Sequence, residues 1–336
     1  MYSQLLEQVI ARTDLSSEDM EAIMNQMMQG ELTQAQIGAF LVGMRMKGET
    51  PTEIAAAAAI MRKHATPIDT RGQQVVDTCG TGGDGANTVN ISTAAAIVAA
   101  AAGVRIAKHG NRSVSSKSGS ADVLRALGVN IEIGPEQVAD CIAEVGIGFL
   151  FAPMLHGAMK HAIGPRRELG VRTLFNMIGP LSNPAAAQAQ VVGVFHRDLT
   201  PVFAKVLAKL GLERALVVHG LDGLDEITTT ATTQVSELKD GAIATYELNP
   251  DEFFTERATL AALRGGEPEE NARIIRDVFA GAGGAVADII ALNAAAAIYV
   301  GNVADSLKNA LEVARLCLAS GAALQKLDQL AARTQA

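Results

Sequence analysis

Apolar side chains recur every three or four positions over roughly the first 65 residues, which is the spacing of one helical face. The positions that carry this pattern are Leu5, Val9, Ile10, Met20, Ile23, Met24, Met27, Ile37, Phe40, Leu41 and Met44. Asp14 or Ser16 is placed to cap the second helix, and Thr33 precedes a further helical run. The pattern predicts several short helices. Its methionines favour a role in the core or in a subunit interface over metal binding.

From Val75 onward the pattern changes to short apolar runs, rich in β-branched residues, that alternate with helical stretches. We expect strands at 74–78, 104–107, 129–133, 148–152, 191–195 and 215–218. Gly103, Gly128, Gly146 and Gly211 each follow a helical stretch, where a left-handed residue commonly ends a helix. This alternation predicts a largely parallel central sheet covered by helices.

The C-terminal third continues with different elements. Residues 235–238 and 242–248 flank the turn Lys239-Asp240-Gly241, which predicts a hairpin that closes the sheet. From Asp251 the pattern is helical, with breaks at 265–266 and 281–284. The predicted fold class is therefore α/β with an all-α N-terminal domain.

Composition narrows the classes of function. The 336-residue chain has a formal net charge of −8, which disfavours nucleic-acid binding because phosphate backbones would be repelled. Cys79, Cys141 and Cys317 are far apart and form no zinc or disulfide pattern, so we expect a reducing, cytoplasmic location. The acidic N-terminus does not resemble a signal peptide, and no apolar run reaches the roughly 20 residues that a membrane span requires. We expect no membrane partner.

A glycine-rich turn is the strongest local signal. The sequence DTCGTGGDG at 77–85 follows a predicted strand and precedes an Ala-rich helix that begins near Ser92 and Thr93. Glycines let backbone N–H groups approach an anion, and a helix N-terminus offers further unpaired donors. The spacing matches neither the P-loop of ATPases nor the dinucleotide fingerprint. The turn therefore indicates a pyrophosphate site of another kind.

Two further loops follow predicted strands. Residues 108–120 carry two lysines, one arginine and five serines, a local patch of cations and donors suited to phosphate oxygens. The loop at 219–226 contains Asp225 and Glu226, and adjacent carboxylates at a strand end commonly hold Mg²⁺. For residues 108–120 a flexible, solvated loop is the second interpretation, whereas an acidic loop such as 219–226, taken alone, is more often solvated surface. Beside the glycine turn, at the carboxyl edge of a parallel sheet, the binding interpretation is favoured.

These motifs together resemble a known family. The stretches DTCGTGGDGANTVNIST, KHGNRSVSSKSGSADVLRALGV, RRELGVRTLFNMIGPLSNPA and LDGLDEITTT are similar to those of the anthranilate phosphoribosyltransferases of tryptophan biosynthesis. These enzymes lie within the nucleoside phosphorylase/phosphoribosyltransferase family. The resemblance covers nearly the whole chain, with several motifs in the same order. It implies transfer of the phosphoribosyl group of phosphoribosyl pyrophosphate to the amino group of anthranilate.

The resemblance also assigns residues. It places the donor at Gly80, Gly83, Asp84, Thr88, Asn90, Ile91, Ser92, Thr93, Lys108, His109, Gly110, Asn111, Arg112, Ser113, Val114, Ser115, Ser116 and Ser120. It places Mg²⁺, with two ions when the donor is bound, at Ser92, Asp225 and Glu226. It places anthranilate at Gly80, Asn111, Arg166 and Gly179. Lys108 and Asp84 would be the catalytic residues, and Arg167 could exchange roles with Arg166.

The fold implied by the resemblance has a helical domain at 1–70, joined by a segment near 165–185, and an α/β domain at 71–336. The ligands would lie between the domains, and a homodimer would form through the helical domain. One departure from the family pattern is Leu155-His156-Gly157, which bears on the entrance for the aromatic acceptor. A pyrimidine nucleoside phosphorylase and a nucleic-acid-binding paralogue are the alternatives, and Asn111 and Arg166 count against both.

Three potentially reactive side chains, those of Cys79, His109 and His156, are expected to have roles other than catalysis. Cys79 is expected to be a packed residue and not a nucleophile, because an anionic ligand nearby would disfavour a thiolate. His109 and His156 are expected to position other groups, although either could act as a base. The displacement needs no covalent intermediate, and charge stabilisation by Mg²⁺, Lys108 and backbone N–H groups should dominate.

Overall fold

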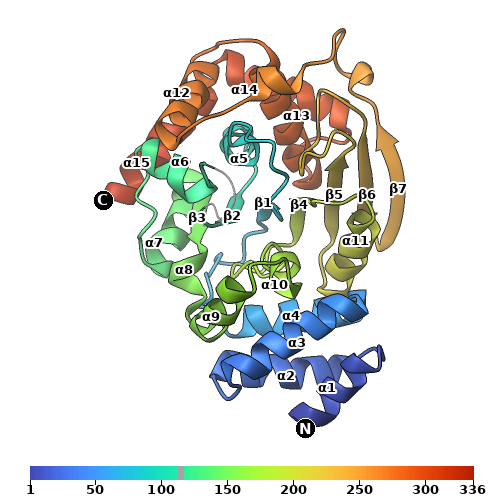
Figure 1. Ribbon diagram of the computed structural model, residues 1–336. Coiled ribbons are helices and arrows are strands. Elements are labelled where there is room, and N and C mark those ends of the chain that lie inside the picture. The colour runs from blue at the N-terminus through green and yellow to red at the C-terminus, as the bar shows by residue number, and fades with distance from the viewer. Residues whose placement is uncertain (113–116) are drawn as a thin grey trace.

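The computed structural model describes residues 1–112 and 117–336, and it begins with a bundle of helices (Figure 1). These are α1 (Tyr2–Ile10), α2 (Ser17–Gln29), α3 (Gln34–Lys47) and α4 (Pro51–Lys63). Ser16 caps α2 by accepting the Asp19 N–H at 3.0 Å, and Thr33 caps α3. Met20, Met24 and Met27 are fully buried. The methionine stripe is therefore core in the single chain, and the helical prediction for this region is confirmed.

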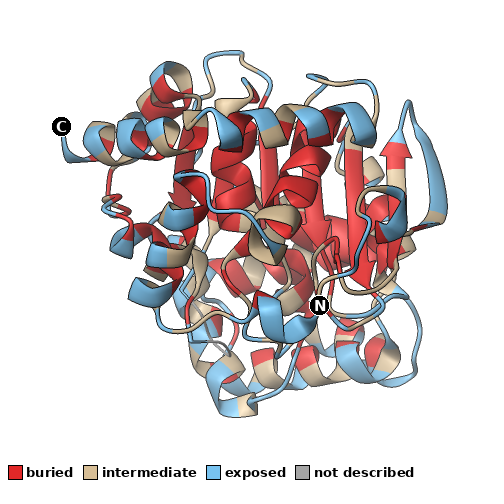
Figure 2. Ribbon diagram, turned by 90° about the horizontal axis from the view of Figure 1, so that it is seen from above, coloured by how far each residue is buried: buried red, intermediate tan, exposed pale blue. Residues whose placement is uncertain are grey.

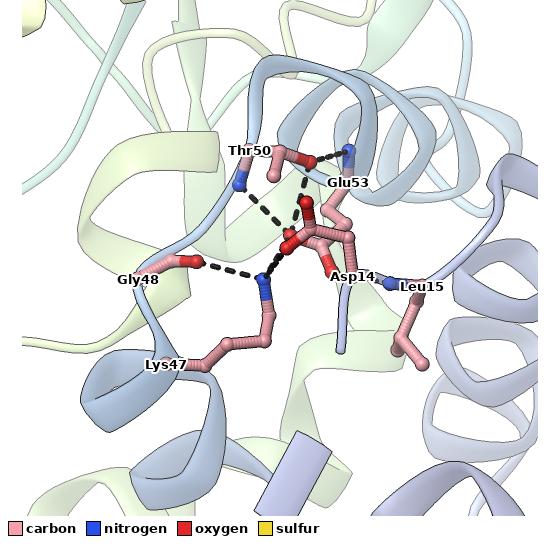
Figure 3. A network of polar contacts seen from close by, with 6 residues as sticks. All are labelled: Asp14, Leu15, Lys47, Gly48, Thr50 and Glu53. Carbon is pink, nitrogen blue, oxygen red and sulfur yellow. Dashed lines mark hydrogen bonds and ion pairs between the residues drawn. The ribbon is translucent and has the colours of Figure 1, made fainter. Parts of the chain in front are cut away.

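A buried ionic network joins the ends of these helices (Figure 3). Glu53, fully buried near the start of α4, accepts hydrogen bonds from the N–H groups of Leu15 and Thr50, both at 2.8 Å. The Lys47 ammonium lies 2.9 Å from Glu53 and 2.7 Å from Asp14. Asp14 therefore pairs with Lys47 and leaves the cap of α2 to Ser16. One carboxylate ties the α1–α2 connection to the α3–α4 connection.

The strands of the described residues form one mixed sheet in the order β3-β2-β1-β4-β5-β6-β7. They are β1 (Val76–Gly80), β2 (Ile106–Gly110), β3 (Ile147–Phe151), β4 (Ala189–Gly193), β5 (Arg214–Gly220), β6 (Thr233–Lys239) and β7 (Ala242–Leu248). Strands β1 to β5 pair in parallel, and β6 and β7 add an antiparallel hairpin. The predicted parallel sheet and its closing hairpin are confirmed.

The two faces of the sheet enter different cores, as the period-two geometry of a strand requires. On β5, Leu216 and Val218 pack with α5 (Ile91–Ala101) and α13 (Ala285–Val300). Ala215 and Val217 on the same strand pack with α11 (Leu199–Lys209) and the N-terminal bundle. Figure 2 shows the buried strands between helices whose outer faces are exposed.

The remaining helices pack on the helices that cover the sheet, beside β3, or against the bundle. They are α6 (Ser120–Ala126), α7 (Pro135–Asp140), the π-helix η1 (Cys141–Val145), α8 (Ala152–Leu155), the 3₁₀ turns η2 (Gly157–Met159), η3 (Pro250–Glu252) and η4 (Leu260–Leu263), α9 (Lys160–Leu169), α10 (Leu174–Ile178), α12 (Pro268–Phe279), α14 (Leu307–Ala319) and α15 (Ala322–Gln335). Helices α9 and α10 pack on α2, α3 and α4 (Figure 1). No helix in the described part of the chain is long and apolar enough to span a membrane.

The strand predicted at 129–133 is wrong. Val129, Ile131 and Ile133 are buried and alternate with polar residues, as in a strand, but the segment pairs with none. The Asn130 N–H instead donates to Thr334 Oγ1 on α15 at 3.0 Å. Alternating burial against a helix gives the same sequence pattern as a half-buried strand. By contrast, the glycines predicted to end helices at 103, 128, 146 and 211 all have positive φ.

The buried network predicts that Glu53→Ala destabilises the chain strongly. The substitution removes two backbone hydrogen bonds and leaves Lys47 buried opposite one exposed partner, so the free energy of unfolding should fall by about 3 kcal/mol. Urea denaturation measures this. Glu21→Ala on the exposed face of α2 is the control and should change the value by less than about 0.5 kcal/mol. Equal effects of the two variants would contradict the prediction.

Candidate active site

The site begins where loops fold back over the carboxyl ends of the parallel strands. Strands β1, β2, β4 and β5 each end in a glycine. A Cβ on Gly193 would lie 1.6 Å from the backbone oxygen of Asp225, and one on Gly80 would lie 2.5 Å from Asp225 Oδ2. A larger residue at position 193 would therefore displace the backbone of residues 219–226, here called the acidic loop, and one at position 80 would push away the Asp225 carboxylate. The glycines bring Asp225 directly onto the ends of β1 and β4.

The glycine turn after β1 is anchored at its start by main-chain contacts. The Thr81 N–H donates to the Gly193 carbonyl at 2.9 Å, and the Phe195 N–H donates to Thr81 Oγ1 at 3.0 Å. The Gly82 N–H donates to Asp225 Oδ2 at 2.8 Å. Gly82 and Gly83 both have positive φ, which L side chains rarely adopt. The turn predicted from sequence is thus built onto the acidic loop.

Carboxylates converge beside this turn. Burial, followed by the charge of the neighbouring Asp84, raises the pKa of Asp225 to about 6. Burial and the charge of Asp225 raise the pKa of Glu226 to about 8. Glu226 Oε1 accepts the Ser92 N–H at 3.2 Å, in the first turn of α5. Ser92, Asp225 and Glu226, the predicted metal ligands, therefore lie together with Asp84.

Residues that were not predicted to bind a ligand hold the acidic loop in place. Asp222 accepts hydrogen bonds from the Thr228 hydroxyl at 2.6 Å and the Leu224 N–H at 3.2 Å. The Asn293 side chain, buried on α13, donates to the Ile227 carbonyl at 2.8 Å and accepts the Ile227 N–H at 3.0 Å. The residue after Glu226 is thus fixed to the core by an amide. A polar residue in the apolar run of α13 was the only sequence signal for this contact.

Lys108 is buried at the centre of the site. Its ammonium donates to the Thr78 carbonyl and lies 3.5 Å from Ser92 Oγ. Burial lowers the pKa of Lys108, while the charges of Asp77 and Glu226 oppose that shift. Asp77 is fully buried and accepts the His109 N–H at 3.0 Å. The Lys108 ammonium at the end of β2 therefore lies near two carboxylates, that of Asp77 on β1 and that of Glu226 in the acidic loop.

The second predicted loop begins at the end of β2. Ser120 Oγ donates to the Asn111 carbonyl at 3.2 Å, and a Cβ on Gly110 would lie 2.4 Å from that hydroxyl oxygen. Arg112 extends outward over the Phe151 ring and toward Glu132. Residues 113–116, predicted as donor contacts, lie outside the described residues. Asn111 and Ser120 are brought together as expected.

The other predicted donor residues have mixed exposure. Asn90 at the start of α5 is bonded to Ser118 and Asn271. Thr88 is half-buried in a bridge with Arg264. Ile91 and Thr93 are each 1% exposed, so both residues are enclosed by the protein in this structure.

Two of the predicted acceptor residues, Arg166 and Gly179, lie next to α10. The Arg166 guanidinium lies 5.0 Å from the ring centroid of Phe175, while the neighbouring Arg167 is exposed. Gly179 follows α10, and its backbone lies near enough to His109 to oppose the lowering of that histidine's pKa. Within 1–112 and 117–336, no hydrogen bond or ion pair joins Arg166 to Asn111. The geometry favours Arg166 over Arg167 as the inward-facing residue.

His109 and His156 form a buried pair near the acceptor residues. Their Nε2 atoms are 3.1 Å apart. Burial and the charge of His156 lower the pKa of His109 to about 3, and burial lowers that of His156 to about 4. Both rings are therefore neutral at neutral pH.

Cys79 is not activated as a nucleophile. Burial raises the pKa of its thiol well above the ordinary value, and the Gln190 side chain donates a hydrogen bond to its sulfur.

Arg172 is a residue of the site that the sequence interpretation left without a role. It lies between α9 and α10, within the stretch RRELGVRTLFNMIGPLSNPA, in which Arg166 and Gly179 were assigned a role. Its guanidinium donates to the Gly83 carbonyl and lies 3.9 Å from the Phe195 ring centroid. Its position in the fold, next to the glycine turn, could not be read from a linear motif.

Comparison with known proteins agrees with this geometry. Residues 72–324 match the glycosyl transferase family, a/b domain, and residues 3–65 match the helical bundle domain of the same family. Anthranilate phosphoribosyltransferase from Acetivibrio thermocellus is 53% identical over 98% of this chain and 95% of its own length. The chain belongs to the anthranilate phosphoribosyltransferase family.

Solved structures of this family have the same fold. The Thermus thermophilus enzyme gives a TM-score of 0.94 at 44% identity, over 98% of this chain and 99% of its own. The Saccharomyces cerevisiae enzyme in complex with PRPP and Mg gives 0.89 at 28% identity, over 99% and 98% of the two chains. The same yeast enzyme in complex with 4-fluoroanthranilate gives 0.90 at 27% identity, over 99% and 97%. The recognised resemblance and the fold class are confirmed.

The neutral histidine pair predicts a fall in stability below neutral pH. The unfolded chain binds a proton on each histidine near pH 6.5, but native His156 does so only near pH 4. The free energy of unfolding should fall as pH drops through this window, with His156 contributing roughly 2 to 3 kcal/mol. Urea denaturation of His156→Gln should show a flatter pH profile. The exposed His196→Gln should keep the wild-type profile, and equal profiles for all three proteins would refute this assignment.

Proposed function

We propose that the chain transfers the 5-phosphoribosyl group of phosphoribosyl pyrophosphate to the amino group of anthranilate. The products would be N-(5-phosphoribosyl)anthranilate and pyrophosphate, in tryptophan biosynthesis. The observation that carries the proposal is the convergence of Asp84, Asp225, Glu226 and Lys108 around a glycine turn and the start of α5. A pyrophosphate with Mg²⁺ complements such a mixture of carboxylates, ammonium and backbone N–H groups.

The residues fit a magnesium site completed by the ligand. Asp225 and Glu226 supply hard oxygen atoms, and burial together with neighbouring carboxylates raises their pKa values, a situation that a bound cation would relieve. Among the described residues, no group of three His, Cys, Asp or Glu is arranged to hold a metal alone. We infer that phosphate oxygens complete the shell of two Mg²⁺ ions. When bound, these ions neutralise charge on the departing pyrophosphate.

The chain's own groups would align and stabilise the reactants. Lys108, whose ammonium lies 3.5 Å from Ser92 Oγ, would stabilise negative charge that develops on the leaving group, and burial would strengthen its effect. Asn111, Arg166 and Gly179 would orient anthranilate, with the Arg166 guanidinium directed at its carboxylate. The acceptor amine is already neutral, so His109 and His156 need not remove a proton before attack. No covalent nucleophile is required.

The organisation around the site is part of the same proposal. We infer a helical domain of residues 1–70 joined by 165–185, and a donor-binding domain of residues 71–336. A homodimer through the helical domain would use exposed apolar residues such as Ile10 and Met46, because the methionine stripe is buried in the single chain. A cytoplasmic location and the absence of nucleic-acid partners stay predictions.

The direct test is the loss of anthranilate fluorescence on mixing the protein with phosphoribosyl pyrophosphate. Fluorescence should fall with Mg²⁺ present and stay constant with excess chelator. Pyrophosphate release should match anthranilate consumption. Constant fluorescence with Mg²⁺ and both substrates would refute the proposed reaction.

Arg166→Ala should raise the Michaelis constant for anthranilate far more than that for the donor. Only the acceptor presents a carboxylate to this residue, and a lost charge-assisted hydrogen bond costs about 1.5 to 3 kcal/mol, or roughly ten- to a hundredfold. Initial rates with each substrate varied in turn measure both constants. Arg167→Ala, on the exposed side of α9, is the matched control. Similar increases for the two substrates would contradict the assignment.

The double substitution Asp225→Asn/Glu226→Gln should give a folded but nearly inactive protein. Amides keep the size and part of the hydrogen bonding while removing the charges that bind metal, so turnover should fall roughly a hundredfold or more at an unchanged melting temperature. Asp240→Asn/Glu247→Gln on the exposed hairpin is the matched control. Near-normal turnover with unaltered Mg²⁺ dependence in the site variant would show that the donor alone carries the metal.

A further inference from the structure

Arg172 connects the helical bundle, the sheet and the glycine turn. Its guanidinium donates to the Gly83 carbonyl and lies 3.9 Å from the ring centroid of Phe195, just beyond β4. The Arg172 carbonyl in turn accepts a hydrogen bond from Arg45 on α3. The segment between α9 and α10 therefore reaches from the bundle to the turn that follows β1.

The contact supports a part of the turn that is intrinsically soft. Thr81 and Gly82 anchor its start, but Gly83 and Gly85 have positive φ and can adopt many other conformations. Within this part of the turn, a local hydrogen bond runs from the Ala86 N–H to Asp84 Oδ1 at 3.2 Å. The Gly83–Arg172 bond ties the middle of the turn to a distant element, directly before Asp84.

The chemistry of the contact suits arginine in particular. A guanidinium can stack on an aromatic ring and donate in its own plane to a carbonyl at the same time, which an ammonium does less well. A Cβ on Gly83 would lie 2.7 Å from Arg172 Nη2, so a side chain there would shift the guanidinium, and the positive φ of Gly83 also favours glycine. Phe195 serves both partners, because its N–H donates to Thr81 Oγ1 while its ring supports Arg172.

We propose that Arg172 is a positioning residue for the phosphoribosyl donor, acting through the Gly83 carbonyl. It holds the turn in the conformation that directs Asp84 and the backbone N–H groups of the turn toward the donor. The proposal rests on the proposed function for the identity of that donor. Arg172 differs in this from Arg166, which faces the acceptor side.

The test is Arg172→Met, which keeps the length and apolar stem of the side chain but cannot donate. The donor Michaelis constant and the calorimetric dissociation constant for phosphoribosyl pyrophosphate with Mg²⁺ should both rise roughly tenfold. The anthranilate constant and the turnover number should change by less than about threefold. Arg172→Lys should recover part of the donor affinity, because one N–H donor is restored.

Arg315→Met is the matched control. Arg315 also lies over a phenylalanine ring, that of Phe254 at 5.3 Å, and donates to the Phe253 carbonyl at 3.3 Å, but on α14. It should leave both substrate constants unchanged. A purely structural role for Arg172 would lower the melting temperature and the active fraction without altering donor affinity, and that result would overturn the proposal. Equal losses for donor and acceptor would overturn it as well.

A double-mutant cycle adds a second measure. Phe195→Leu should weaken donor binding by a smaller factor than Arg172→Met, and the two effects should be clearly less than additive, since both loosen the same turn. Full additivity would contradict action through a shared support. Calorimetry separates this proposal from the proposed reaction. If the wild type binds the donor but does not consume anthranilate, only the reaction fails, whereas equal donor affinity in wild type and Arg172→Met refutes the role of Arg172.

Discussion

The close approach of the acidic loop to the glycines that end β1 and β4 is the constraint on which the site depends. The Asp225 backbone occupies the space where Gly193 would carry a side chain, and its carboxylate occupies the corresponding space at Gly80. This contact puts Asp225 within reach of the Gly82 N–H and places Glu226 at the start of α5. The parallel sheet provides the common edge, and the absence of two side chains brings the loops into contact there.

This close approach is electrostatically unfavourable because it crowds carboxylates together, and other parts of the fold offset the effect. Asp225 and Glu226 are crowded with Asp84 in a partly desolvated site, and their pKa values are raised in consequence. Lys108 supplies a buried positive charge nearby, and Asn293 fixes the backbone of the acidic loop from α13. A bound cation, as proposed for this site, would relieve the repulsion among these carboxylates.

The helical bundle contributes to the site through its contacts with the segment around α10. The Arg62 side chain on α4 donates to the Leu181 carbonyl at 2.7 Å, and Arg45 on α3 contacts the Arg172 carbonyl. Helix α10 lies between α4 and the strand ends, with Phe175 against Arg166 and Gly179 beside His109 (Figure 1). The residues proposed to bind the acceptor are thus positioned by the bundle, and those proposed to bind the donor mainly by the sheet.

The sequence by itself determined the elements and the chemistry of the loops, because periodicity, caps and glycine spacing are local properties of the chain. It predicted the helical N-terminus, the parallel sheet with its hairpin, and the convergence of the glycine turn with Asp225 and Glu226. Tertiary structure decided the rest. Packing on α15 made 129–133 a buried loop, and contacts far apart in sequence gave Asn293 and Arg172 their positions. Such contacts depend on which surfaces meet after folding, and no local pattern encodes them.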